Sequence, residues 1–188
     1  MNAEVARRVT VRAARPGDAA AIRELDGLSA ASRSLVDHDL SAADRCCLVA
    51  VESHPTDAAV GGYGEVVGDG EVVGDVEVVG YAATLVQLGE AEVLDLVVTP
   101  SLRGQRVGSL LFDALLDAAK EHGADAVTLE VRPDNTVSRA LYRHRGFVVE
   151  GRRPDYYADG SDALIMWRRP VPAAPEADRD AADHREDR

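Results

Sequence analysis

The stretch Leu94–Leu115 joins an apolar strand to an amphipathic helix through a turn rich in arginine and glycine. The strand breaks at Thr99-Pro100, because proline has no backbone N–H for a sheet ladder. Apolar residues then recur with a period of 3.6, which predicts a helix with one buried face. That face should carry Val107, Leu110, Leu111, Ala114, Leu115 and Ala118.

The turn Arg103–Gly108 places several backbone N–H groups at the N-terminus of this helix. These amides have no acceptor within the helix and lie at the positive end of its dipole, so they form a site suited to a pyrophosphate. The glycine spacing differs from G-x-G-x-x-G, and no Lys-Ser/Thr follows Gly108, so neither common nucleotide-binding motif matches. A tight turn with no ligand is the alternative interpretation.

The charge of the chain is unevenly distributed around a net value of −12. Residues 1–100 hold 7 Lys or Arg against 17 Asp or Glu, whereas residues 101–153 hold 9 against 7. The anion-binding turn therefore lies in the positive region of an acidic chain. This argues against duplex nucleic acid as a partner, which needs a basic surface. A small polyanion held locally and a cationic second substrate are compatible with it.

Length and apolar patterning predict one domain in the cytoplasm. A chain of 188 residues can bury a real core, and no apolar run approaches the 18 residues of a membrane span. The N-terminus has no apolar segment of the secretory kind.

The adjacent Cys46 and Cys47 lie in an apolar strand and are expected to be buried, unpaired thiols. The histidines show no metal-ligand spacing, so no metal is predicted.

Periodicity and turn signals divide the chain into a loose arm over 1–8, a domain over 9–169 and a disordered acidic tail over 170–188. The predicted strands are Val9–Ala13, Cys46–Val51, 76–88, Glu92–Val98, Ala126–Arg132, a strand from Phe147, and Ala163–Arg168. The predicted helices begin at Pro16, span 28–45, run from Val107 to His122-Gly123, and span 136–145 with Asn135 or Asp134 as cap. This order indicates a mixed sheet covered by helices.

The segment 62–79 contains most of a six-residue repeat, with Glu-Val-Val-Gly at 65–68, 71–74 and 77–80. Asp69-Gly70 between two copies predicts a β-hairpin. Because the copies are nearly identical, strand register is weakly specified. We interpret it as a tolerated low-complexity expansion of a hairpin, with a ligand clasp as the alternative.

The element order, the turn RGQRVG and the strings LEVRPDN, ALYRHRGF and YYADGSDALIM resemble the GNAT superfamily of acyl-CoA N-acyltransferases. Within it they look like the protein N-terminal acetyltransferases, which include the ribosomal-protein-alanine acetyltransferases and archaeal relatives. The resemblance covers about 9–169 and is specific over 94–166. It implies an α/β fold with a central mixed, mostly antiparallel sheet flanked by helices. It also implies acetyl-CoA as co-substrate, a protein or peptide N-terminus as acceptor, such as that of a ribosomal protein, and a monomer or weak dimer.

The resemblance also assigns the residues that bind acetyl-CoA. Leu96, Val97 and Val98 are expected to present backbone groups to the acetyl-pantetheine arm, and residues 104–109 to wrap the diphosphate. The expected cofactor-binding set is Leu96, Val97, Val98, Arg103, Gly104, Gln105, Arg106, Val107, Gly108, Ser109 and Asn135. Arg106 replaces the middle glycine usual in the family. If that position requires φ > 0, arginine costs about 1 kcal/mol there; if not, its charge can contact a phosphate.

Acetyl transfer to an amine requires a neutral amine, a stabilised oxyanion and a proton for the leaving thiolate. In AVTLEVR, Val127, Leu129 and Val131 should face one side of the sheet, and Thr128, Glu130 and Arg132 the other. Glu130 is thus a carboxylate expected mid-strand inside a sheet, which is costly unless it is paired. The family match favours a general base with a pKa raised by burial; an ion pair with an arginine on a neighbouring strand is the alternative.

Three tyrosines complete the predicted site. By resemblance Tyr142 is the general acid, because a phenol with pKa near 10 can protonate a thiolate near 8.5; ordinary packing is the alternative. Tyr156 and Tyr157 are expected either to line the peptide entrance or to anchor their loop. Asn135 is expected to hydrogen-bond the pantetheine as well as cap its helix, with capping alone as the alternative.

These residues favour an acetyl-CoA-dependent N-α-acetyltransferase. An α-amine with pKa about 8 is roughly one-tenth neutral at pH 7, whereas lysine at about 10.4 is far less so. A second hypothesis keeps the chemistry and changes the acceptor to a small amine or a lysine side chain. A third is a non-catalytic acyl-CoA-binding or sensing module in which Glu130 is structural.

Overall fold

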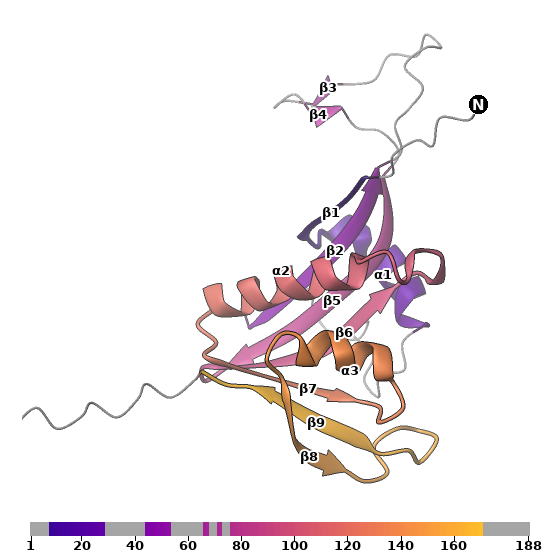
Figure 1. Ribbon diagram of the computed structural model, residues 1–188. Coiled ribbons are helices and arrows are strands. Elements are labelled where there is room, and N and C mark those ends of the chain that lie inside the picture. The colour runs from indigo at the N-terminus through magenta and orange to yellow at the C-terminus, as the bar shows by residue number, and fades with distance from the viewer. Residues whose placement is uncertain (1–7, 29–43, 54–65, 68–70, 73–75, 171–188) are drawn as a thin grey trace, which may run out of the picture.

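The computed structural model describes residues 8–28, 44–53, 66–67, 71–72 and 76–170 (Figure 1). Several predicted segments lie wholly or mostly outside these residues. They are the arm over 1–8, the helix over 28–45, most of the repeat over 62–79 and the tail over 170–188.

Seven strands form one sheet in the order β1-β2-β5-β6-β7-β9-β8. Their bounds are β1 Arg8–Ala13, β2 Arg45–Ser53, β5 Val76–Gln87, β6 Glu90–Val98, β7 Ala126–Val131, β8 Val148–Arg153 and β9 Ala163–Arg168. Neighbouring strands are antiparallel except β6 and β7, which are parallel. The predicted mixed, mostly antiparallel sheet is confirmed.

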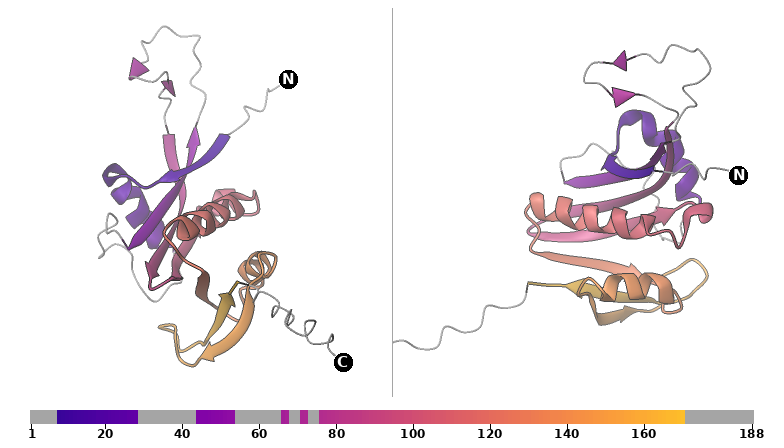
Figure 2. Two further views of the ribbon diagram at one scale, coloured as in Figure 1. Left: turned by 90° about the vertical axis from the view of Figure 1, so that its left-hand side faces the viewer. Right: turned by 45° about the horizontal axis from the view of Figure 1, so that its top comes forward.

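The helices cover the sheet on both faces, with α1 on one face and α2 and α3 on the other (Figure 2). Their bounds are α1 Ala19–Asp26, α2 Val107–Glu121 and α3 Thr136–Arg143, with short 3-10 helices η1 Pro16–Asp18 and η2 Pro100–Leu102. Each face has its own core: Ile22 and Leu25 of α1 pack on one side, and Leu111 and Leu115 of α2 on the other. The sheet therefore separates an α1 side from an α2/α3 side.

The buried face of α2 is wider than the predicted stripe and is displaced from it. Val107, Leu111 and Leu115 are buried as expected, but Leu110 is 48% exposed. Ala114 and Ala118 of the predicted stripe are only half-buried. The residues buried in their place are Phe112, Leu116 and Ala119. The helix packs on the sheet and also against an aromatic group from the α3 segment, so it buries two adjacent faces instead of one stripe.

Within the repeat segment, the described residues form a short antiparallel pair of strands, β3 Val66–Val67 and β4 Glu71–Val72. Val66 pairs with Val72, as expected for a hairpin around Asp69-Gly70. The following strand, β5, begins at Val76 as predicted.

The strands β6 and β7 pair over only part of their length. The parallel register runs from Glu90–Val93 of β6 to Ala126–Leu129 of β7, although β6 continues to Val98. Leu94 is an extra residue in β6, because Thr84 of β5 pairs with Val93 and the preceding residue of β5, Ala83, pairs with Asp95. Such a bulge increases local twist and bends its strand. The two strands accordingly diverge toward α3 (Figure 1).

Local signals end the helices where the sequence predicted. Gly123 after α2 and Gly146 after α3 both have φ of 84°. Asn135 caps α3, since its side chain accepts a hydrogen bond from the Ser138 N–H at 3.0 Å, which decides between Asn135 and Asp134. Cys46 and Cys47 are buried and unpaired, as predicted. None of the helices among the described residues is long and apolar enough to cross a membrane.

Candidate active site

A cleft of about 800 Å³ lies where β6 and β7 separate. It is bounded by β6, the turn before α2, the end of β7, the first part of α3 and the loop before β9. Its lining residues are Leu28, Val93, Leu94, Asp95, Leu96, Val97, Val98, Leu102, Arg103, Gly104, Gly108, Leu129, Glu130, Val131, Arg132, Asn135, Val137, Ser138, Leu141, Tyr142 and Tyr157. Most of the residues predicted to bind acetyl-CoA, and both predicted catalytic residues, therefore meet in one cavity.

The donor wall of this cleft is β6 and the turn before α2. Of the predicted cofactor residues, Leu96, Val97, Val98, Arg103, Gly104, Gly108 and Asn135 line the cleft. The others, Gln105, Arg106, Val107 and Ser109, are outside its lining. Val107 is the first residue of α2 and is buried, and the side chains of Gln105 and Arg106 are exposed. None of these four residues lines the cleft, so their predicted contacts with acetyl-CoA stay predictions.

Arg106 has a φ of 66°, so the position does require a left-handed backbone. This decides between the two predicted consequences of the missing glycine, because an L-residue there costs about 1 kcal/mol. The preceding Gly104 has φ 79°, and a Cβ added to it would meet nothing within 4 Å. The strained turn positions the first amides of α2: Leu110 N–H donates to Arg106 C=O at 3.0 Å. The amides before Leu110 precede this first bond and have no intrahelical acceptor.

Glu130 lies on the face of β7 opposite the core, as the predicted alternation requires. Val127, Leu129 and Val131 are buried in the core cluster under α2. Glu130 is not mid-strand, because it follows Leu129, the last residue of β7 paired with β6, and Pro133 ends the strand soon after. Its side chain is 11% exposed and lines the cleft.

The alternative predicted for Glu130, an ion pair with an arginine, is present as well. Arg153 Nη1 lies 3.1 Å from Glu130 Oε1. Arg153 belongs to β8, one strand beyond the neighbour β9, and reaches across it. The arginine side chain is 47% exposed and also lies 5.2 Å from the Tyr156 ring centroid. The carboxylate is therefore paired and is still in the cleft.

Tyr142 is buried on α3, and its ring packs against Phe112 and Phe147 at centroid distances of 4.9 and 6.1 Å. Burial raises the pKa of Tyr142 well above its ordinary value; the negative charge of Asp95 adds to this, and a hydrogen bond with Ser138 opposes it. The predicted match between a phenol of pKa near 10 and a thiolate is thus wrong in magnitude, because low-dielectric surroundings disfavour the phenolate. Tyr142 keeps its proton and is better suited to donate a hydrogen bond.

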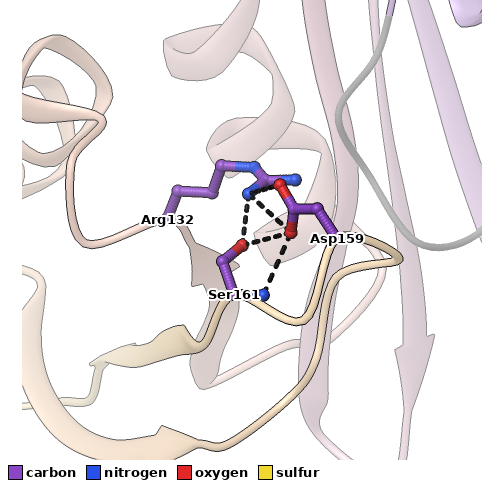
Figure 3. A network of polar contacts seen from close by, with 3 residues as sticks. All are labelled: Arg132, Asp159 and Ser161. Atoms are coloured by element: carbon purple, nitrogen blue, oxygen red, sulfur yellow. Dashed lines mark hydrogen bonds and ion pairs between the residues drawn. The ribbon is translucent and has the colours of Figure 1, made fainter.

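The loop before β9 is fixed by a polar network around Arg132 (Figure 3). Arg132 Nη1 donates to Asp159 Oδ2 at 2.9 Å and also to the Ser161 hydroxyl. Ser161 donates to Asp159 through its hydroxyl at 2.6 Å and its N–H at 3.0 Å. These hydrogen bonds from Ser161, and then Arg132, lower the pKa of Asp159 to about 2. The loop is held to the end of β7 by charge-assisted bonds.

The same arginine positions one of the two predicted tyrosines. The Arg132 guanidinium carbon lies 3.8 Å from the centroid of the Tyr157 ring, a cation–π contact. Tyr157 is buried and lines the cleft, and burial raises its pKa to about 12. Tyr156 is half-buried, packs edge-on against Tyr157 at 5.0 Å and is outside the lining. Tyr157 thus faces the cleft, and Tyr156 contacts it from outside the lining; the entrance role and the anchor role both stay predictions.

A carboxylate that sequence reasoning missed lies on the β6 side of the cleft. Asp95 Oδ2 accepts a hydrogen bond of 2.6 Å from the Tyr81 hydroxyl, and Oδ1 accepts one of 2.9 Å from the Leu96 N–H. The Tyr81 hydroxyl is also 2.9 Å from Asp26 Oδ1 at the end of α1. The available signal was the single acidic residue in the otherwise apolar run Leu94–Val98.

The donor wall fits an acyl-CoA in both shape and chemistry. A Cβ added at Gly108 would make an ordinary contact of 3.7 Å with Val98 Cγ2, and both residues line the cleft, so the glycine leaves the first turn of α2 open to a ligand there. Helix amides and Arg103 offer donors for a diphosphate. The part of β6 beyond Val93 extends past its pairing with β7, so its backbone groups can meet an extended amide-containing arm. Within the described residues, no group of three or more His, Cys, Asp or Glu could hold a metal ion.

The sequence profile described as "Acetyltransferase (GNAT) family" matches residues 36–147, more than half of the chain. The chain belongs to the GNAT acetyltransferase family. The resemblance inferred from the turn and the strings around Glu130 and Tyr142 is therefore confirmed at the level of the family.

Curated proteins similar to this GNAT chain carry a more specific name. It is 36% identical over 88 residues to the putative [ribosomal protein bS18]-alanine N-acetyltransferase of Bacillus subtilis, covering 46% of this chain and 58% of that protein. It is 36% identical over 93 residues to the [ribosomal protein bS18]-alanine N-acetyltransferase of Escherichia coli, covering 48% and 63%. The chain thus matches less than two thirds of the length of each.

Solved structures agree with the GNAT fold over nearly the whole chain. The ribosomal-protein-S18-alanine N-acetyltransferase of Escherichia coli superposes with a TM-score of 0.65 at 22% identity, covering 90% of this chain and 99% of that one. Ard1 from Thermoplasma volcanium gives 0.65 at 27% identity, covering 87% and 98%. The fold class predicted from the sequence is confirmed.

Proposed function

We propose that this chain is an acetyl-CoA-dependent N-acetyltransferase that acetylates the N-terminal α-amine of a protein. The observation that carries the proposal is that Glu130, Tyr142 and the turn around Gly104 line one cleft. The names of the relatives from Bacillus subtilis and Escherichia coli support a protein N-terminus that begins with alanine as the acceptor. Such an acceptor would place the reaction in the cytoplasm.

In this proposal the donor wall binds and orients acetyl-CoA, which supplies the thioester. The first amides of α2, with Arg103, hold the diphosphate, and the backbone of Leu96–Val98 holds the pantetheine arm. Asn135, which caps α3 at the cleft, contributes its side-chain N–H groups. Positioning by backbone groups fixes the acyl carbon without depending on particular side chains.

Glu130 takes the proton from the attacking amine. It is 11% exposed, and its partner Arg153 is half-exposed at the rim, so the guanidinium can move toward water when an acceptor enters. A carboxylate within reach of the amine supplies general-base catalysis of about 10²–10⁴-fold. Glu130 thus forms an ion pair with Arg153 in the resting site and acts as the base once an acceptor has entered.

Tyr142 donates a hydrogen bond to the thioester sulfur as the thiol leaves. Because its raised pKa keeps the phenol protonated, it stabilises developing negative charge without being ionised itself. Over one turnover the amide C–N bond forms as the thioester C–S bond breaks. The proton that Glu130 removes from the amine is released to water, which balances the proton that the CoA thiolate takes up as it leaves.

The test is acetyl transfer to three acceptors measured by mass spectrometry. The acceptors are a peptide with a free N-terminal alanine and no lysine, the same peptide N-terminally blocked but carrying one lysine, and a polyamine. We expect the free N-terminus to be modified at least tenfold faster, because its amine is neutral more often at pH 7. Preference for lysine or the polyamine would favour the second hypothesis, and acetyl-CoA binding without transfer to any amine would favour the sensing module.

A further inference from the structure

The bulge in β6 gives the cleft a second carboxylate that the proposed chemistry does not use. Leu94 is the extra residue, and as a result Leu94 and Asp95 both project to the α1 side of the sheet, where Tyr81 also lies. Glu130 projects to the same side from β7, since its neighbours Leu129 and Val131 face the opposite core. The two carboxylates thus line one cleft from two diverging strands.

Asp95 is held rigidly. The Tyr81 hydroxyl that donates to it is on a fully buried ring, and that hydroxyl is also in contact with Asp26 of α1. The Leu96 N–H fixes the other carboxylate oxygen. A carboxylate has about four acceptor sites, so these bonds set its direction and still allow it to accept further donors. Such support from buried neighbours is typical of residues that orient a substrate.

The position of Asp95 relative to the proposed chemistry is indicated by its effect on Tyr142. Its negative charge reaches the Tyr142 phenol and, after burial, is the largest influence that raises the pKa of that phenol. Asp95 therefore lies near the reacting end of the cleft. The cations described on the opposite wall are engaged elsewhere, Arg132 with Asp159 and Arg153 with Glu130.

We propose that Asp95 is a specificity-determining residue that binds the acceptor amine in its ammonium form. This rests on the proposed function and adds to it the class of acceptor that is captured. The ammonium donates to Asp95 on β6, and one of its protons passes to Glu130 on β7 and from there to water, which leaves the neutral amine to attack. As the C–N bond forms and the thioester C–S bond breaks, Glu130 accepts the second proton from the nitrogen, and the CoA thiolate takes up one proton as it leaves. Because most α-amines are protonated at pH 7, a site that captures the ammonium uses the abundant form of the acceptor.

The test is a binding cycle in the presence of CoA, which cannot transfer an acyl group. The probes are a peptide that begins with alanine and the same peptide beginning with a propionyl group, which lacks only the amine. Isothermal titration calorimetry gives Kd for both on the wild-type protein and on Asp95→Asn, which keeps the size and one acceptor oxygen. Asp117→Asn, on the exposed side of α2, removes an equal charge away from the cleft and is the matched control.

We expect the wild-type protein to bind the amine peptide about tenfold more tightly than the propionyl peptide. Asp95→Asn should remove most of that difference by weakening the amine peptide alone, and Asp117→Asn should preserve it. Tyr81→Phe, which removes the anchor but keeps the ring, should reduce the difference partially and serves if Asp95→Asn does not fold.

Equal weakening of both peptides by Asp95→Asn, or no change in either, overturns the inference. The proposed function is judged separately by turnover of the alanine peptide with acetyl-CoA on the wild-type protein. Turnover with no amine-specific loss in Asp95→Asn rejects only the inference, and absence of all turnover rejects the proposed function.

Discussion

The two walls of the cleft present different chemical groups to a ligand. The donor wall, formed by β6 and the turn before α2, offers mainly backbone groups, and four of its predicted positions direct no side chain into the cleft. The wall formed by β7 and the loop before β9 offers side chains, Glu130, Arg132 and Tyr157. A backbone wall tolerates a change such as arginine for the usual middle glycine at 106, at a cost in strain. A side-chain wall depends on the identity of each residue.

Tyr142→Phe should have the largest effect among the tests of this contrast, because it removes a side-chain donor and keeps the ring. We expect kcat to fall about 100-fold with the Kd for acetyl-CoA unchanged. The raised pKa means that the phenol keeps its proton as pH rises, so the wild-type rate should show no decline from Tyr142 up to about pH 10. Steady-state kinetics against pH check both. Tyr156→Phe, which removes a tyrosine hydroxyl outside the cleft lining, is the matched control. A fall in the wild-type rate that Tyr142→Phe abolishes would contradict the assignment.

Gly108→Ala tests the backbone wall. The added methyl lies 3.7 Å from Val98 Cγ2, an ordinary contact, so the fold should tolerate it. Alanine is also the better helix former by up to about 1 kcal/mol. We expect acetyl-CoA to bind about tenfold more weakly, because the methyl obstructs close approach to the helix amides. Isothermal titration calorimetry measures the affinity for acetyl-CoA, and thermal unfolding measures the stability. Ser109→Ala, which keeps its amide, should bind normally, and equal loss in both variants would assign the effect to the helix as a whole.

Arg153→Gln tests the side-chain wall through the partner of Glu130. The guanidinium lies 3.1 Å from the carboxylate and has to move aside before Glu130 can take a proton from the amine. We expect kcat/KM for the alanine peptide to change by no more than about threefold, because an ion pair with a half-exposed arginine is worth about 0.2–1 kcal/mol. Arg153→Lys, which keeps the charge, should behave as the wild type in the same steady-state assay. A loss of about 100-fold in Arg153→Gln would instead show that Glu130 depends on the arginine for its position.

Arg106→Gly should have the smallest effect and no effect on chemistry. Glycine relieves a left-handed backbone at φ 66°, so the free energy of unfolding should rise by about 0.5–1 kcal/mol. Gly104→Ala, at φ 79°, is the matched opposite and should lower it by a similar amount. Urea denaturation measures both. Loss of acetyl-CoA affinity in Arg106→Gly would instead mean that the arginine side chain contacts the ligand.

The parts of the fold set by local pattern could be predicted from the sequence, and those set by packing between elements could not. Alternation placed Glu130 opposite Val131, and Gly123 and Gly146 ended their helices where expected. The burial of Phe112 in place of Leu110 could not be read from α2 alone, because it depends on contact with the α3 segment. The side of the sheet to which Asp95 projects depends on a one-residue bulge, which could not be located from the sequence, although an acidic residue in the apolar run Leu94–Val98 was a signal that could have drawn attention to it.

The candidate site likewise has some features that could be predicted from the sequence and others that could not. Arg103 and Gly104 of the turn, Tyr142 and Tyr157 line the cleft and could be singled out in the sequence, because the family resemblance covers the strings that contain them. The ion pair of Arg153 with Glu130 spans three strands, and the raised pKa of Tyr142 follows from burial, so both required the tertiary arrangement.

The most direct test of the central claim is Glu130→Gln, with acetyl-CoA binding and acetyl transfer to an alanine peptide measured on the same sample. If this cleft holds the donor by its backbone wall and activates the amine by its side-chain wall, the Kd for acetyl-CoA will stay within twofold while kcat falls at least 100-fold. A variant that binds acetyl-CoA and transfers acetyl groups at the wild-type rate would contradict the account.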